Sequence, residues 1–296
     1  MDAVRLTPPR RLRLPVANRW GAGEMAVLDF GDPARPVDLV FVHANGFNAM
    51  TYRTLLAPLS GALRVWAPDL RGHGASALPA EPQGRRGWAD HRDDLVALLD
   101  AIDGPPVVLA GHSMGGTAAL LAAAARPEKV SRLVLLDPVI WTRWSQGLLR
   151  LPLFDRMARR IPLVKSALRR RAVFDSREQA LAAYRDRGAF RGWPETLLID
   201  YLTDGLTETA AGFALSCPPE WEASNYAAQA HDPWRALREF RGPVRILKAV
   251  EGSTCHVPVA PRGLPHVSVE IVAGGTHFFP MLQADVARDA LFEAAV

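Results

Sequence analysis

The sequence predicts an α/β protein with a mostly parallel sheet that is flanked by helices and interrupted by an inserted helical segment. Short apolar runs rich in β-branched residues alternate with helical spacing through residues 37–136, as in parallel sheets that helices cover on both faces. The strand-like runs then stop over residues 138–231 and resume at residues 244–249 and 267–272. A GHSMGG turn at residues 111–116 joins one apolar run to an alanine-rich stretch.

The core elements follow from periodicity and from the glycines and prolines between them. Buried strands read as short apolar runs, whereas residues 88–102 space Leu95, Leu98 and Leu99 as one face of a helix. In chain order, strands are expected at residues 11–18, 25–30, 37–42, 63–67, 106–110, 130–136, 244–249 and 267–272. Helices of the core are expected at residues 51–59, 88–102, 117–125, 233–240 and 284–294.

The middle of the chain is predicted to form a helical cap inserted into this core. Helical stretches are expected there at residues 147–159, 163–171, 177–186 and 195–206. The expected division is therefore a core of residues 1–137 and 232–296 and a cap of residues 138–231. Five of the eight tryptophans lie in this cap or at its edge.

Composition is that of an ordinary soluble globular enzyme: of the 296 residues, 49% are hydrophobic and 22% are charged. No apolar stretch reaches the roughly 18 residues of a membrane span, and residues 1–20 lack the apolar core of a signal peptide. The two cysteines are far apart and form no metal-binding pattern. We therefore expect a cytoplasmic protein with no metal, no cofactor and no stable membrane insertion.

Arginines cluster at residues 156–160 and 169–171, and the net charge is +4. No nucleic-acid-binding motif accompanies the clusters, so the expected interpretation is a solvated helix face without a nucleic-acid partner. The sequence does not determine the oligomeric state.

The GHSMGG turn has the G-x-S-x-G pattern of a nucleophile elbow. Its glycines allow a sharp strand-to-helix turn that presents the Ser113 hydroxyl above the sheet edge. The start of the following helix offers free N–H groups to a developing oxyanion. Ser113 is the expected nucleophile, and the Met114 N–H an expected oxyanion donor.

Four motifs together resemble those of the α/β-hydrolase superfamily: HANGF at residues 43–47, DLRGHGAS at 69–76, GHSMGG at 111–116 and GGTHFFP at 274–280. The resemblance extends from about residue 27 to the C-terminus. It implies a serine esterase or lipase-like protein with a helical cap, in which His277 is the base that takes the proton of Ser113. A serine at the elbow, where haloalkane dehalogenases and epoxide hydrolases carry an aspartate, implies an acyl-enzyme.

The second oxyanion donor is expected from the HANGF loop. The sequence departs from the usual His-Gly-x pattern here, since Ala44 replaces the glycine. Asn45 takes the third position and is the favoured donor, with Phe47 as the alternative if the loop is longer.

The resemblance also implies a catalytic triad in which an acid orients the histidine, and at the acid this sequence departs from the family pattern. Most members carry an aspartate after the strand at residues 244–249, where this chain has Gly252 or Ser253. Asp137, at the end of the preceding strand, is the favoured acid because that strand should lie beside the one that bears Ser113. Glu251 is the alternative, and Asp232 a further one.

These residues predict hydrolysis of a carboxylic ester or related acyl bond in a small-molecule substrate. A lactonase or a carbon–carbon bond hydrolase on the same scaffold is the alternative enzyme. A catalytically inactive hydrolase fold that binds a ligand is the alternative outside enzymes. Trp141 and Trp221 are expected to line an apolar site that prefers a short-to-medium or aromatic acyl group.

Overall fold

A computed structural model describes residues 8–151 and 160–296 and confirms the predicted α/β fold. Eight strands form one sheet in the order β1-β2-β4-β3-β5-β6-β10-β11. The strands β1 and β2 pair antiparallel, as do β2 and β4, and the pairs from β4 to β11 are parallel. Their bounds are β1 Arg10–Asn18, β2 Gly21–Phe30, β3 Leu39–Val42, β4 Val65–Pro68, β5 Val107–His112, β6 Val130–Leu136, β10 Val244–Glu251 and β11 Val267–Thr276.

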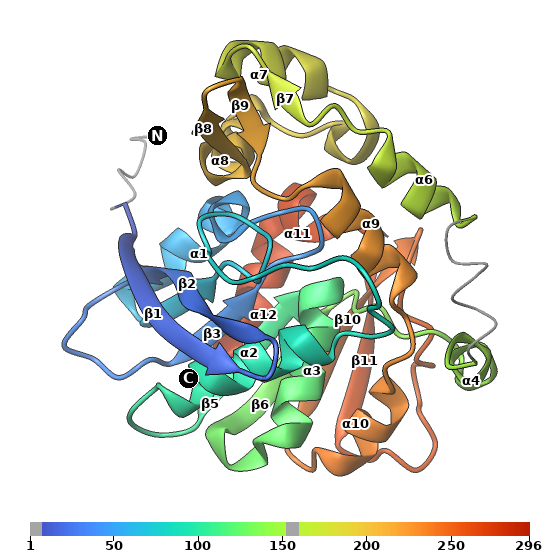
Figure 1. The fold of residues 1–296 in the computed structure, drawn as a ribbon. Coiled ribbons are helices and arrows are strands. Elements are labelled where there is room, and N and C mark those ends of the chain that lie inside the picture. The colour runs from blue at the N-terminus through green and yellow to red at the C-terminus, as the bar shows by residue number, and fades with distance from the viewer. Residues whose placement is uncertain (1–7, 152–159) are drawn as a thin grey trace.

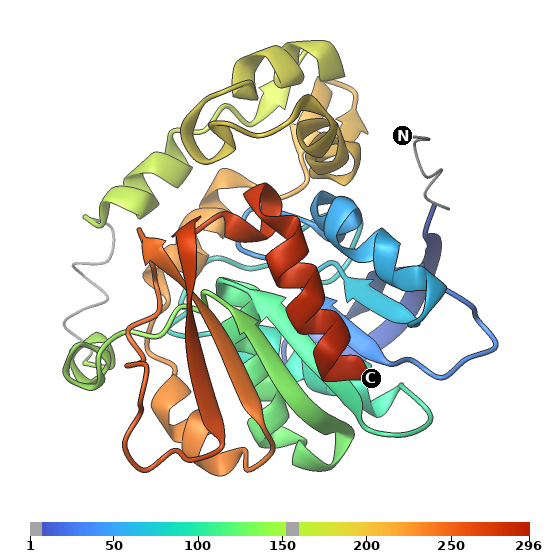
Figure 2. The same cartoon turned by 180° about the vertical axis from the view of Figure 1, so that it is seen from behind.

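Helices cover both faces of this sheet. The helices α2, α3 and α10 lie on the face toward the viewer in Figure 1, and α12 lies on the opposite face, which Figure 2 shows. The core helices are α1 Arg53–Leu56, α2 Ala89–Asp100, α3 Met114–Ala125, α10 Pro233–Glu239, α11 Phe279–Leu282 and α12 Ala284–Ala295. Short 3₁₀ turns occur at Ala49–Tyr52, Ala57–Gly61 and Pro127–Lys129.

Each central strand is apolar along its whole length because its side chains alternate between two cores. Val107 and Leu109 of β5 pack in the core under α2, α3 and α10, whereas Val108 and Ala110 pack in the core on the other face. The strand has no residue that faces solvent, which is why it reads in sequence as a continuous apolar run.

The described residues between 138 and 231 lie over the edge of the sheet where the parallel strands end (Figures 1 and 2). The described helices here are α4 Arg143–Leu149, α6 Pro162–Leu168, α7 Arg177–Tyr184, α8 Glu195–Gly205 and α9 Pro219–Ala227, with a 3₁₀ turn at Gly188–Phe190. We call this part of the chain the inserted segment. Its separation from the core as a cap domain stays a prediction.

The inserted segment is not purely helical, which corrects the sequence-based expectation. Strands β7 Val173–Phe174, β8 Leu206–Thr209 and β9 Gly212–Leu215 form a small antiparallel sheet in the order β7-β9-β8. These strands have two to four residues, too few for an alternating pattern to be recognised. Trp221, which is expected to line the site, lies in the first turn of α9, which begins at Pro219.

Two helix predictions differ in their bounds. The helix expected at residues 51–59 is broken into α1 between two 3₁₀ turns, because Pro58 begins a new turn instead of continuing the helix. The helix expected at residues 147–159 begins earlier, as α4, and ends at Leu149. The rest of that prediction lies largely outside the described residues, as does most of the arginine cluster at 156–160.

Candidate active site

Ser113 occupies a strained turn between β5 and α3. Its φ of 54° and ψ of −120° lie outside the backbone regions that residues other than glycine normally adopt. The neighbouring Gly115 permits the turn, because a Cβ there would lie 2.3 Å from the carbonyl oxygens of Val42 and His43. The serine hydroxyl is thereby held at the carboxyl edge of the sheet, beside the N-terminus of α3.

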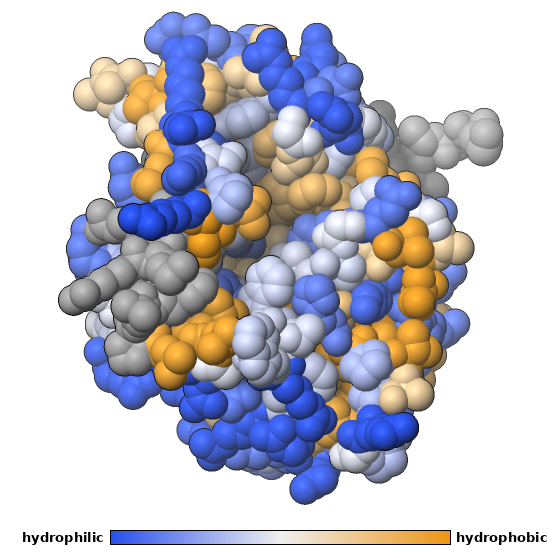
Figure 3. Space-filling view, turned by 90° about the vertical axis from the view of Figure 1, so that its right-hand side faces the viewer, coloured by the Kyte–Doolittle hydropathy of each residue, from blue (hydrophilic) through white to orange (hydrophobic). Residues whose placement is uncertain are grey.

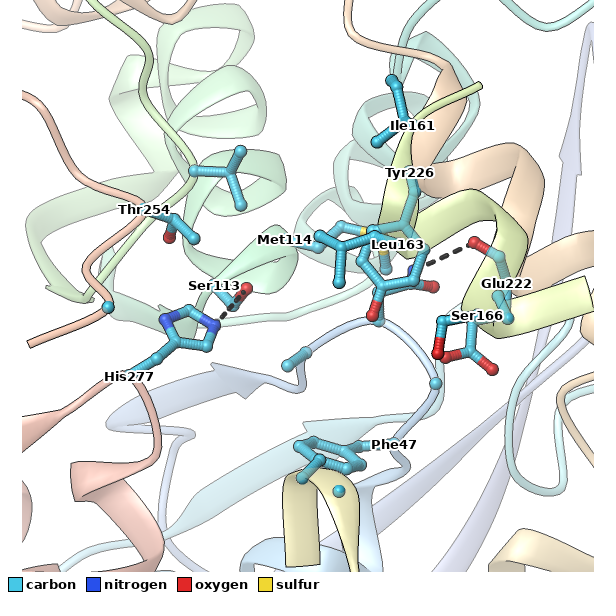
Figure 4. Close-up of a pocket in the computed structure, with 18 of the residues that line it drawn as sticks. Phe47, Ser113, Met114, Ile161, Leu163, Ser166, Glu222, Tyr226, Thr254 and His277 are labelled. Atoms are coloured by element: carbon cyan, nitrogen blue, oxygen red, sulfur yellow. Dashed lines mark hydrogen bonds between the residues drawn. The ribbon is translucent and has the colours of Figure 1, made fainter. Parts of the chain in front are cut away.

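The structure brings Ser113, His277 and Asp137 into one chain of hydrogen bonds. His277 follows β11, and its Nε2 lies 3.0 Å from Ser113 Oγ (Figure 4). Its Nδ1 lies 2.6 Å from Asp137 Oδ2. Asp137 follows β6, which pairs with β5 on one side and β10 on the other, as the sequence predicted for the strand next to Ser113.

The Asp137 carboxylate is fully buried and hydrogen-bonded on both oxygens. Oδ1 accepts the Ala249 N–H at 3.0 Å and the Ser253 hydroxyl at 2.6 Å, and Oδ2 accepts the Thr254 N–H at 3.0 Å. Burial opposes ionisation, but the hydrogen bonds from His277, Ser253 and Ala249 hold the pKa of Asp137 below its usual value. Asp137 is therefore an anion that faces the Nδ1 of His277.

The structure places the alternative acids elsewhere. Glu251 is exposed at the end of β10 and lines the cavity described below, and none of the described hydrogen bonds joins it to His277. Asp232 caps α10, where it accepts the Arg235 N–H at 2.9 Å and the Arg150 guanidinium at 2.8 Å.

The loop after β3 carries the two candidates for the second oxyanion donor, the backbone N–H groups of Asn45 and Phe47. The N–H of Phe47 donates to the Ala44 carbonyl at 3.2 Å, and the N–H of Gly46 donates to His73 Nε2 at 3.1 Å. Within the described residues, this leaves the N–H of Asn45 as the loop donor without an assigned acceptor. Asn45 and Met114 both line the same cavity as Ser113.

A second hydrogen-bonded chain runs behind Ser113 and was not foreseen from the sequence. The Ala44 N–H donates to Tyr52 Oη at 3.1 Å, and Tyr52 donates to His112 Nδ1 at 2.7 Å. His112 Nε2 then donates to the backbone carbonyl of His277 at 2.8 Å. Burial, together with the nearby His277, lowers the pKa of His112 to about 3, so its imidazole is neutral and can accept at Nδ1.

The hydrogen-bonded serine and histidine open into a cavity of about 1420 Å³. Figure 3 shows a hollow on this face of the molecule, with apolar side chains in its depth. Apolar lining residues come from both the core and the inserted segment, and include Phe47, Leu148, Leu149, Leu151, Ile161, Leu163 and Phe278. Such a cavity suits a largely apolar ligand.

Of the two tryptophans expected at the site, Trp141 lines the cavity and Trp221 does not. Trp221 is buried between the inserted segment and the core, where its Nε1 donates to the Arg71 carbonyl at 2.9 Å. The Arg85 guanidinium stacks over its ring at 4.0 Å. Trp221 therefore packs α9 onto the core, and its helix neighbours Glu222 and Tyr226 face the cavity instead.

The arginine cluster at residues 169–171 is solvated only in part. Arg169 and Arg171 are exposed, but Arg170 turns inward to the cavity wall. There it pairs with Glu222 and donates to Tyr201 Oη at 2.7 Å. Helical periodicity could have separated Arg170 from its neighbours, but its acidic partner lies 52 residues away in sequence.

The described residues contain neither a cluster of metal ligands nor a helix that could span a membrane. No three His, Cys, Asp or Glu side chains in residues 8–151 and 160–296 gather closely enough to hold a metal ion. None of the helices described in those residues has both the length and the apolar character of a membrane span.

Comparison with known proteins gives a family and several relatives. The model of the Alpha/beta hydrolase family matches residues 39–290. Among curated proteins, the chain is similar to lipase LipV of Mycobacterium tuberculosis, with 37% identity over 110 residues. It is also similar to 2-hydroxymuconate semialdehyde hydrolase of Pseudomonas sp. strain CF600, with 38% identity over 102 residues. These matches cover 36% and 33% of this chain and 40% and 35% of the relatives, so less than half of either relative is spanned.

A solved structure extends the likeness to nearly the whole chain. The crystal structure of E-2-(acetamidomethylene)succinate hydrolase matches with a TM-score of 0.74 at 21% identity. The match covers 96% of this chain and 98% of that one. At this identity the likeness concerns the fold alone.

Proposed function

The chain belongs to the alpha/beta hydrolase family, and from this premise we propose that it is a serine hydrolase that cleaves a carboxylic ester or related acyl bond. The observation that carries the proposal is the hydrogen-bonded chain from Ser113 through His277 to Asp137, which opens into an apolar cavity. A nucleophile, a base within hydrogen-bond reach and a group that orients the base are the parts that acyl transfer requires.

In the proposed reaction, His277 Nε2 removes the proton from Ser113 Oγ as the oxygen attacks the acyl carbonyl. Asp137 accepts a hydrogen bond from the Nδ1–H of His277, which fixes the reactive tautomer, and its negative charge stabilises the imidazolium that forms. The backbone N–H groups of Met114 and Asn45 receive the oxyanion. His277 then protonates the leaving alcohol, and a water molecule activated by the same imidazole releases the acid from the serine ester.

The cavity supports an apolar acyl or alcohol group in the substrate. Its volume of about 1420 Å³ exceeds the range of about 300–1,000 Å³ that is common for small-molecule sites. Longer acyl groups than the short-to-medium chains expected from sequence would therefore fit. We further propose that residues 138–231 act as a cap that supplies much of this lining.

Carbon–carbon bond hydrolysis is the second candidate. It is favoured by the similarity to 2-hydroxymuconate semialdehyde hydrolase and by the presence of Arg170 in the cavity wall. The Arg170 charge is already paired with Glu222, however, which weakens it as a site for a substrate carboxylate. Ester hydrolysis therefore remains the first candidate.

A labelling and activity experiment tests the proposal. A fluorophosphonate should label the wild-type protein at Ser113, and Ser113→Ala should be unlabelled and lose several orders of magnitude in turnover. p-Nitrophenyl esters from acetate to palmitate, assayed beside a lactone and a dienone acid, identify the bond that is cleaved. Labelling without turnover of any substrate class, or turnover that survives in Ser113→Ala, would contradict the proposed function.

A further inference from the structure

Helix α9 of the inserted segment contacts the loop that carries the proposed oxyanion donor. We propose that Asn225 of α9 is a positioning residue, which holds the oxyanion loop in place by binding the side chain of Asn45. This inference rests on the proposed function, since it assigns Asn225 a role only through that donor.

The Asn45 side chain is held at both ends by α9. Its Nδ2 donates to the Glu222 carbonyl at 3.1 Å, and its Oδ1 accepts from Asn225 Nδ2 at 2.8 Å. The two bonds fix the Asn45 amide, and with it the direction of the adjoining backbone. The contact joins residues 180 positions apart in the chain.

The orientation of the Asn225 amide follows from its other partners. Arg85 Nη1 contacts Asn225 Oδ1 at 2.5 Å, and a guanidinium can only donate, so the oxygen must face it. His91 Nε2 lies 3.0 Å from the same oxygen. The Nδ2 group is therefore directed to Asn45, and because Asn225 is fully buried, no water competes for it.

A second contact brings α9 against the next residue of the loop. The Glu222 carboxylate, paired with Arg170, lies so close to Gly46 that a Cβ there would be 2.9 Å from Glu222 Oε1. In the view of Figure 4, Glu222 lies across the cavity from Ser113 and His277. The N–H of Gly46 is bound from the other side by His73. The loop is thus fixed between the core and α9.

Such support matters because an oxyanion donor acts only from a defined position. Donors work at about 2.7–3.1 Å from the developing oxyanion, and removing one costs roughly 10²–10³-fold in kcat. A donor that is retained but loosened should cost less, about tenfold. The loss should appear in kcat and not in KM, because the interaction exists mainly in the transition state.

The test compares both ends of the Asn225–Asn45 bond. Asn225→Asp keeps an oxygen for Arg85 and His91 but removes the N–H donated to Asn45. Asn45→Ala keeps the backbone N–H and removes the side chain that α9 holds. The two variants and their double are assayed for kcat and KM on p-nitrophenyl butyrate, with thermal unfolding as a check on folding. Ser224→Ala is the matched control, because Ser224 also lies on α9 and binds Arg85 but makes no described contact with Asn45.

Each single variant should lose about tenfold in kcat, with KM changed less than about threefold, and the double should be no worse than the lower single. Ser224→Ala should keep kcat within about twofold of wild type. A normal kcat in Asn45→Ala overturns the proposal even if Asn225→Asp fails to fold, and so do losses that multiply in the double. Ser113→Ala in the same assay separates the two ideas, because its continued activity would refute the proposed function, whereas a normal kcat in Asn45→Ala would refute only the role of Asn225.

Discussion

Replacing Asp137 by asparagine tests the acid of the proposed triad at its most buried point. The left-handed backbone of this residue, with φ at 42°, is tolerated by asparagine as well as by aspartate, so the change leaves the turn intact. The side chain keeps its size and loses its charge and one acceptor.

The hydrogen bonds around Asp137 set the expected magnitude. If the new amide group faces His277, it donates to Nδ1 and forces the proton onto Nε2, where the imidazole can no longer accept from Ser113. If it faces Ala249 instead, a backbone N–H loses its acceptor and the imidazolium loses its counter-charge. Loss of the acid costs about 10⁴-fold in turnover in serine triads, or about 5.5 kcal/mol of activation free energy. Either orientation also leaves one buried N–H unpaired, which costs about 1–3 kcal/mol of folding stability.

The assay is hydrolysis of p-nitrophenyl butyrate by Asp137→Asn and Glu251→Gln, with the melting temperature of each. Ser253→Ala is the matched control, because it removes one hydrogen bond to Asp137 and leaves the contact with His277. We expect Asp137→Asn to be nearly inactive but folded, and Ser253→Ala and Glu251→Gln to stay within about tenfold of wild type. Activity above about a tenth of wild type in Asp137→Asn, with collapse in Glu251→Gln, would refute the reasoning.

Three further predictions concern stability and specificity. First, acid should unfold the protein between about pH 6.5 and 4. Burial lowers the pKa of five imidazoles, so the unfolded chain takes up protons that the folded protein does not bind. These imidazoles are His43, His73, His91, His112 and His231. Burial raises the pKa of Asp69 to about 7 and offsets one of these protons, which leaves a ceiling of roughly 5 kcal/mol per pH unit; a melting temperature constant from pH 7 to 4.5 would contradict this. Second, Arg71→Ala should cost about 3–5 kcal/mol in denaturant unfolding, because it leaves the Asp94 carboxylate buried without its cation; a loss below 1 kcal/mol would disprove this. Third, Trp141→Ala should change the ratio of octanoate to acetate ester turnover, whereas Trp221→Ala should lower stability and leave that ratio unchanged; the reverse pattern would show that the cavity wall is misassigned.

Local sequence patterns were sufficient for the fold and for the turn that bears Ser113. Strands buried on both faces give continuous apolar runs, and a strand-to-helix turn this tight requires glycines at fixed offsets. Both signals are local, because each is carried by a short stretch of consecutive residues. The three-stranded sheet of the inserted segment was missed because its strands are too short to carry a period.

The surroundings of the candidate site were decided by tertiary structure. Asp137 and Glu251 are both carboxylates at strand ends, and the sequence favoured Asp137 but kept Glu251 as an alternative. The pairing of β6 between β5 and β10 is what places Asp137 against His277. The positions of Arg170 and Asn225 depend on partners 52 and 180 residues away. Sequence alone indicated which residues could do acyl chemistry, because each candidate lies in a short local motif or at the end of a predicted strand. The fold decided which of them meet, because hydrogen bonding between distant side chains leaves no periodic trace in a single sequence.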